Sequence, residues 1–219
     1  MKLPSTCVHL LLVLAGSVLL AGCQGTGIMV NFEPRALGSF PNNTTVLQEE
    51  NLTIVVEPFQ DARPQTQRLG SRTHLWGGAT HFNAWNGHVG EGMANLAVAY
   101  LQQRQWRAFR GGADQENNET PRDVTLSGSV LGLNANAKSG FGFTDITVDM
   151  RVRFEAKNTV DGSTVRMVLG ANGSDTVAIF DPKDVERLLN LVAKDLYRQL
   201  FQDLGVNNKA FHLQPRARP

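Results

Sequence analysis

Three histidines stand at regular intervals in one stretch of the chain. His74, His81 and His88 are each seven residues apart, within a segment rich in glycine (residues 70–92). Three imidazoles are a common ligand set for zinc or copper. The regular spacing matches no common metal motif, however, and a hairpin would place two of the rings on opposite strands. We therefore expect solvated or locally hydrogen-bonded histidines and no metal. A metal- or small-ligand-binding role for this segment is the alternative function.

Asp61 and Arg63 are a second place to look for chemistry, because they follow a predicted strand and strand ends often carry active sites. A carboxylate and a guanidinium on alternate residues can form an ion pair or hold a turn. Acid–base catalysis would need a further carboxylate or histidine beside them, and the sequence does not identify one. We expect a structural ion pair or turn.

Four aromatic residues lie among glycines, namely Trp76, Trp85, Phe141 and Phe143. Such surroundings are poor for tight packing. The rings either form a patch that faces lipid or a partner, or they cap an open end of the core, and the sequence does not decide between these. Together with Asp61 and Arg63, they are the candidate patch for a partner or ligand.

The familiar catalytic and cofactor motifs are missing from the sequence. There is no G-x-S-x-G elbow, P-loop, dinucleotide fingerprint or H-E-x-x-H. We therefore predict that the protein is not an enzyme and needs no cofactor. The 21 basic and 20 acidic residues nearly balance, so no nucleic-acid partner is expected.

Cys23 offers covalent chemistry of another kind. The tetrapeptide Leu20-Ala21-Gly22-Cys23 closes an apolar run that begins at Val8, with Lys2 before it. It resembles the lipobox of bacterial lipoproteins, where the chain is cut before the cysteine and the cysteine is then acylated. The run is shorter than the ~20 residues of a spanning helix. A cleavable secretory signal is the alternative, but it would leave the first mature cysteine unexplained.

The lipobox implies a location. Cys7 falls inside the signal and Cys23 would carry lipid, so the mature chain would have no disulfide or free thiol. Gln24 follows the cysteine, where aspartate would favour retention in the inner membrane. We expect a lipid-anchored protein on the periplasmic face of the outer membrane, with an envelope protein or lipid as its partner.

Composition shifts divide the chain into four parts. Predicted are a signal peptide (1–22), a flexible tether (23–51), a single domain (52–205) and a disordered basic tail (206–219). As a coil, the tether would span about 30 Å. Ile28-Met29-Val30 could instead add an edge strand, and the pattern does not decide.

Hydrophobic periodicity predicts the elements of the domain. Alternation of apolar and polar residues over 146–157 predicts a half-buried antiparallel strand. Spacings of three and four predict helices over 92–109 and from 182 onward, the latter with Asp181 as N-cap and Gly205 after its last turn. Further strands are expected at 52–59, 124–133 and 164–169, and a hairpin or glycine-rich loop at 73–85.

This order, strand–helix–strand–strand–strand–helix, predicts an α+β fold. We expect a two-layer sandwich in which a mainly antiparallel sheet of about four strands carries two helices on one face. The lipobox, the tether, Asp61-Ala62-Arg63 after the first strand, Leu69-Gly70 and the element order resemble the YajG-type envelope lipoproteins. More loosely, they are similar to the auxiliary lipoproteins of ABC-type lipid-transport systems. The resemblance implies a non-catalytic accessory domain in envelope maintenance or lipid transport.

Overall fold

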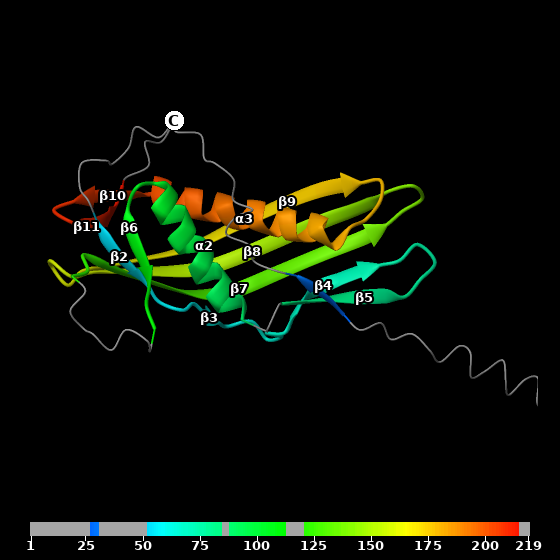
Figure 1. Ribbon diagram of the computed structural model, residues 1–219, viewed down its shortest axis with the longest axis horizontal. Coiled ribbons are helices and arrows are strands. Elements are labelled where there is room, and N and C mark those ends of the chain that lie inside the picture. Colours follow the sequence, from blue (N-terminus) through cyan, green and yellow to red (C-terminus); the bar gives the residue numbers. More distant parts are fainter. Residues whose placement is uncertain (1–26, 31–51, 85–87, 113–120, 215–219) are drawn as a thin grey trace, which may run out of the picture.

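The computed structural model describes residues 27–30, 52–84, 88–112 and 121–214 (Figure 1). The predicted signal peptide, Cys23, most of the tether and Trp85 lie outside these residues. The elements are β1 (Ile28–Val30), β2 (Thr53–Val56), β3 (Gln60–Asp61), β4 (Arg68–Thr73), β5 (Ala79–Ala84), α2 (Val89–Gln103), β6 (Arg107–Arg110), β7 (Val124–Ser139), β8 (Thr144–Asn158), β9 (Thr164–Val177), α3 (Pro182–Gln202), β10 (Leu204–Asn207) and β11 (Ala210–Leu213).

Three long strands form the centre of the sheet. β7, β8 and β9 pair antiparallel in sequence order. Along β8, every even-numbered residue from Thr144 to Asn158 is buried, while Arg151 and Arg153 on the opposite face are exposed. The alternation predicted for 146–157 is therefore confirmed. One face of the sheet is covered, and the other, which we call the wet face, is exposed to solvent.

The sheet is larger than expected, with nine strands in place of about four. The free edge of β7 is long enough to pair in turn with β2, β3 and β4, all in parallel, and β6, β5 and β1 extend the sheet beyond them. Most paired residues still belong to the antiparallel ladders of β7, β8 and β9. The predicted number of strands was too low because the additional strands have only two to six residues, and such short strands show little hydrophobic periodicity.

Both helices lie on the same face of the sheet (Figure 1), as predicted. α3 packs on β8 and β9, while α2 packs on β6, β7 and β2. Asp181 caps α3 as expected, accepting a hydrogen bond from the Lys183 amide while the Asp184 side chain accepts one from the Asp181 amide. The Tyr197 hydroxyl joins the helices by donating to the Met93 carbonyl at 2.6 Å.

The predicted end of the first helix was wrong. α2 ends at Gln103, because Gln105 adopts a positive φ of 68° and turns the chain. Residues 107–109, expected as the last helical turn, belong to strand β6 beside β2. The second helix ends at Gln202 with Asp203 as C-cap, so Gly205 is not a cap and lies in β10.

The expected disordered tail is also corrected as far as the structure describes it. β10 and β11 form an antiparallel hairpin that starts at Leu204. Phe211 is fully buried between the rings of Trp106 and Phe201. The Asn158 amide bonds both backbone groups of Phe211, donating to its carbonyl at 2.9 Å and accepting from its N–H at 2.8 Å. Residues 215–219 lie outside the described part.

The predicted hairpin near 73–85 exists with different bounds. β4 and β5 pair antiparallel, and five residues (74–78), among them Gly77 and Gly78, separate them. The His74 amide donates to the Gly78 carbonyl and the Gly77 amide to the His74 carbonyl, both at 3.1 Å, so the turn begins before the glycines. Ile28-Met29-Val30 forms β1, parallel to β5 at the sheet edge, which decides the alternative that the sequence left open.

Candidate functional site

Three loops leave the sheet at one end (Figure 1, right-hand side). They are the β4–β5 turn (74–78), the β7–β8 turn (140–143) and the segment between β9 and α3 (178–181). The strand register places them together, because Thr73 pairs with Lys138, Ser139 with Thr144, and Thr144 with Val177. Strands lie ~4.8 Å apart, so the loops fit within a row of roughly 15 Å.

Large apolar side chains point into solvent from all three loops. The exposed fractions are 92% for Trp76, 87% for Phe141 and 87% for Ile179, and Leu75 and Phe143 are also exposed. We call these five residues the apolar tip. Since Trp76 and Phe141 contact so little protein, they do not cap the core, and of the two interpretations of these aromatics only a surface role fits them.

The apolar tip stands on an ordered base. Phe180 stacks on the buried Phe82 with ring centroids 6.1 Å apart, and the Arg72 guanidinium lies 4.1 Å from the Phe180 centroid. Arg72 Nε also donates to Ser139 Oγ at 2.9 Å, which joins the hairpin to the end of β7. The base of all three loops is thus fixed while the side chains beyond it are exposed.

Asp61 and Arg63 form the expected ion pair. Arg63 Nε and Nη2 donate to the two carboxylate oxygens of Asp61 at 2.8 and 2.7 Å. The guanidinium also donates to the backbone carbonyls of Thr66 at 2.5 Å and Arg68 at 2.9 Å. The Arg63 side chain is only 4% exposed. All of these bonds lie within residues 61–68, so the pair acts as a clamp on the β3–β4 connection.

The five residues of the candidate patch that the structure describes do not form one surface. β3 pairs with β7 at Ser129 and Val130, roughly ten residues before the end of β7 that carries the apolar tip. The ion pair therefore lies far from Trp76, Phe141 and Phe143. The sequence missed Ile179, whose only signal is an apolar triplet, Ala178-Ile179-Phe180, directly before a helix cap.

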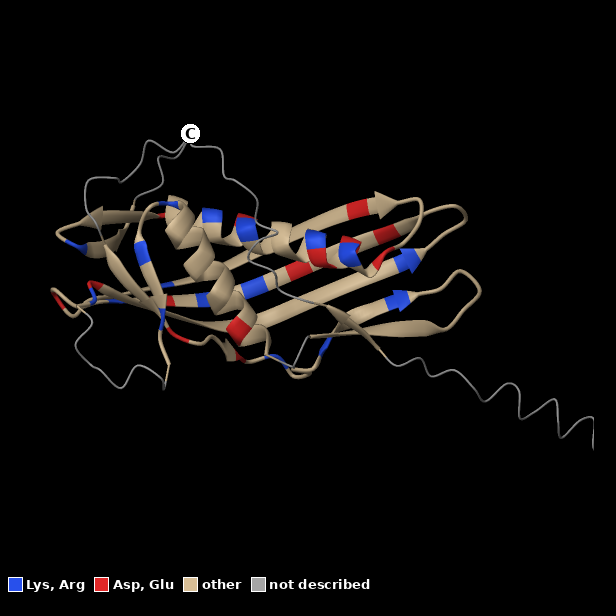
Figure 2. Ribbon diagram, in the orientation of Figure 1, with Lys and Arg blue, Asp and Glu red and all other residues tan. Residues whose placement is uncertain are grey.

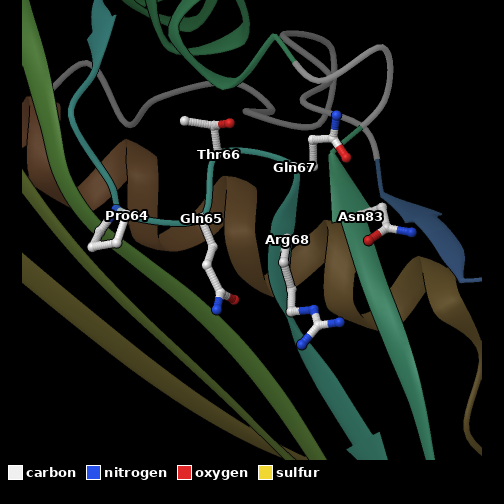
Figure 3. A pocket seen from close by; sticks show the side chains of 6 residues that line it. All are labelled: Pro64, Gln65, Thr66, Gln67, Arg68 and Asn83. Carbon is white, nitrogen blue, oxygen red and sulfur yellow. The ribbon is translucent and has the colours of Figure 1, made fainter.

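A shallow polar hollow of about 390 Å³ opens beside the clamp (Figure 3). Its wall is the loop from Pro64 to Gln67 together with Arg68 and Asn83, which face each other as partners in the β4–β5 ladder. The lining offers side-chain amides and one guanidinium. It can donate and accept hydrogen bonds, but it holds no carboxylate or imidazole for proton transfer.

A second hollow, of about 560 Å³, lies on the wet face of the sheet. Gly132 and Gly170 flank Arg151 on the neighbouring strands, so the Arg151 side chain has no side chain beside it in that row. The adjacent row is polar and consists of Asn134, Asp149 and Asn172. This hollow could not be predicted from the sequence, because only the register of β7 and β9 against β8 brings the two glycines to either side of Arg151.

The three histidines are spread over a turn, a strand and a helix start. His74 Nε2 lies 2.7 Å from Thr80 Oγ1, so this ring is locally hydrogen-bonded as expected. His81 is on β5 opposite Ser71, with its Nδ1 buried and unpaired, and His88 is the residue before α2. Within the described residues, no three His, Cys, Asp or Glu side chains gather to hold a metal ion.

Shifted pKa values occur at structural contacts. Burial raises the pKa of Tyr197 well above its ordinary value. The hydrogen bond from Arg166 lowers the pKa of Glu155, and the hydrogen bond from Arg187 lowers that of Asp175. Arg187 bonds Asp175 Oδ2 at 2.6 Å and thereby ties β9 to the first turns of α3.

Neither helix of the described part is long and apolar enough to cross a bilayer. The chain matches no family model, and no curated protein matches it. The resemblance to YajG-type lipoproteins therefore remains a prediction.

Several solved structures are similar over most of their length. A DUF330 protein of Xanthomonas campestris (XCC0632) is 10% identical, with 79% of this chain and 88% of that chain covered and a TM-score of 0.46. PelC of Paraburkholderia phytofirmans, a dodecamer, is 15% identical, with 69% and 91% covered and a TM-score of 0.39. Lipoprotein GNA1162 of Neisseria meningitidis is 13% identical, with 69% and 99% covered and a TM-score of 0.36.

Proposed function

We propose that this protein is a lipid-anchored envelope lipoprotein whose domain binds another envelope component and performs no catalysis. Its work would be accessory, in envelope maintenance or lipid transport of the kind that YajG-type and ABC-transport auxiliary lipoproteins imply. The observation that carries the proposal is the position of β1. The predicted acylation site, Cys23, is followed after only four residues (24–27) by a strand that pairs with the sheet edge.

The pairing of β1 makes the link between Cys23 and the domain shorter than the tether predicted from the sequence. A free chain from 24 to 51 would hold the domain about 30 Å from its anchor. Because β1 begins at Ile28, the link from Cys23 to the first paired residue is five residue steps, and even fully extended it reaches only ~18 Å. An acylated Cys23 would thus keep the domain at the membrane surface, within reach of membrane-bound partners.

The wet face of the sheet supplies a surface for such a partner. Along β8 it carries only polar residues, and the hollow around Arg151 offers a guanidinium next to Asn134, Asp149 and Asn172. These groups suit a hydrogen-bonding or anionic group of a protein or a lipid. No apolar cavity for an acyl chain is needed for this role.

The anchor is tested by substitution of the cysteine. In cells of a diderm bacterium, Cys23→Ser is expected to abolish labelling by a palmitate analogue and to move the protein from the membrane to the soluble fraction. Cys7→Ser is the matched control and leaves both unchanged, because this residue lies in the predicted signal. A Cys23→Ser protein that stays membrane-bound after signal cleavage would contradict the proposal.

Partner binding is tested by co-purification from gently solubilised membranes, with a tag after Pro219. A reproducible membrane partner that is lost on Arg151→Glu, but kept on Arg166→Glu farther along the same face, supports the hollow around Arg151 as the binding surface. Recovery of the same partner with both variants places binding elsewhere.

A further inference from the structure

We propose that the apolar tip inserts into the interfacial layer of the membrane that holds the protein, so that the sheet stands with this end on the bilayer. The proposal rests on the lipid anchor for its geometry, but the tip's affinity for lipid can be measured without it.

The composition of the three loops points to lipid. Residues 74–78, 140–143 and 178–181 contain no Lys, Arg or Glu, and their one Asp, Asp181, caps α3, although these are the outermost loops at this end. Single exposed apolar residues are ordinary on protein surfaces. Here three adjacent loops each present one that is nearly fully exposed, Trp76, Phe141 and Ile179. Tryptophan with aliphatic and phenyl neighbours is the composition favoured at the membrane–water interface.

The direction of β1 brings the anchor to the same end. β5 starts at Ala79 beside the apolar tip and runs away from it, and β1 is parallel to β5, with Ile28 opposite Phe82. The chain before Ile28 therefore enters from the side of the tip. Phe82 is about 10 Å from the start of β5, which is within the ~18 Å that the link from Cys23 can reach. Acyl chains on Cys23 and the apolar tip can meet one membrane plane.

The shape of the apolar tip favours a bilayer over a protein partner or a second copy. Stable protein interfaces bury about 800 Å² per partner on continuous, complementary surfaces. The tip consists of separate protrusions, and two of its turns contain glycines with positive φ, at Gly77, Gly78 and Gly142. A lipid interface accepts such protrusions without a matching shape.

Charge plays a minor part in this contact. Directly behind the loops, β4 and β7 carry Arg72 and Lys138, while β8 and β9 carry Asp145 and Asp175 (Figure 2). Both signs would lie near the headgroups, so their attraction to anionic lipid largely cancels. Lipid binding by the tip is therefore expected to change little between low and high salt.

Depth-dependent quenching tests the orientation in the acylated full-length protein. After signal cleavage and acylation no free thiol is left, so Phe141→Cys or Val160→Cys can be labelled with bimane. Val160 is 62% exposed in the β8–β9 turn at the opposite end of the sheet. In vesicles of phosphatidylethanolamine and phosphatidylglycerol with shallow nitroxide lipids, we expect strong quenching at 141 and none at 160. Equal quenching at both positions, or none at 141, would overturn the proposal.

A second measurement separates the tip from the anchor. The mature chain with Cys23→Ser is floated with the same vesicles, alone and with Trp76→Ser, Phe141→Ser and Ile179→Ser combined. We expect the triple variant to lose at least about tenfold in partitioning, because even partial burial of three large side chains is worth that much. The control combines Val160→Ser, Val168→Ser and Leu213→Ser, which are exposed elsewhere.

The outcomes are distinct. If the natural protein proves unacylated, the proposed function fails. The flotation result still shows whether the apolar tip binds lipid. If the triple variant, the control and the parent protein partition equally into vesicles, the proposed membrane insertion of the apolar tip is refuted. Binding to native membranes but not to protein-free vesicles also refutes it, because it would identify a protein as the occupant. Circular dichroism should show the same fold in all variants, since the changed positions are exposed.

Discussion

Removal of the Arg63 side chain should cost a large part of the stability, because its guanidinium is the centre of the β3–β4 clamp. Arg63→Ala removes the charged partner of the mostly buried Asp61 carboxylate, which keeps the hydrogen bond from the backbone N–H of residue 63, and it removes a donor from the backbone carbonyls of Thr66 and Arg68. Breaking one side of a buried ion pair costs about 3–5 kcal/mol. The clamp lies under a surface loop that can admit water, so we expect the lower end, about 3 kcal/mol.

The comparison is with an ion pair of the same chemistry on the surface. Arg166 bonds Glu155 at 2.8 Å, but its side chain is 65% exposed. Solvent-exposed pairs of this kind contribute little to stability, so Arg166→Ala should be nearly neutral. Equilibrium urea unfolding followed by circular dichroism measures both. With a slope of about 2 kcal/mol/M, Arg63→Ala shifts the midpoint by roughly 1.5 M.

If Arg63→Ala and Arg166→Ala shift the midpoint equally, the clamp is not structural, and a ligand-binding role for Arg63 becomes the better explanation. Asp61→Asn, Arg63→Met and the double variant close a double-mutant cycle, and the coupling should be at least ~1 kcal/mol if the two side chains act as a pair.

Three further predictions follow from the structure. Phe211→Ala should destabilise by about 3–5 kcal/mol in urea unfolding, whereas Leu213→Ala, 57% exposed, should change little; equal effects would mean that the C-terminal hairpin is not part of the core. The lowered pKa of Asp175 adds stability above its ordinary carboxyl range, and this is lost as pH falls through the lowered value; the difference between wild type and Asp175→Asn should therefore shrink toward pH 2, and a difference that grows instead would contradict the pair with Arg187. Protein purified without chelator should contain no stoichiometric zinc or copper by elemental analysis, and one equivalent of either would revive a metal site in residues 70–92.

The central ladder could be predicted because its chemistry is local. β8 alternates along its whole length, since one face packs on helices and the other faces water. The prediction for β9 stopped at Leu169 because its helix-facing residues then become Ala171 and Gly173. A Cβ on Gly173 would come within 2.8 Å of Val192 of α3, so the small residue marks close helix packing that the sequence alone presents as loss of pattern.

The short strands and the candidate patch depended on contacts that the sequence does not state. Residues 107–109 continued a helical pattern, yet pairing with β2 makes them part of a strand. Whether Asp61 and Trp76 share a surface is set by where β3 and β4 meet β7, and the register separates them. The exposed aromatics were identified by type, but only the row from Thr73 to Val177 shows that Ile179 joins them.

The central claim is that lipid on Cys23 holds this domain at a membrane through a link of four residues. Its most direct test is the intact mass of the full-length protein isolated from membranes. The account predicts a chain that begins at Cys23 and carries the added mass of a diacylglyceryl group, with or without a further acyl chain. A mature chain that begins elsewhere, or that begins at Cys23 without added lipid, would contradict it.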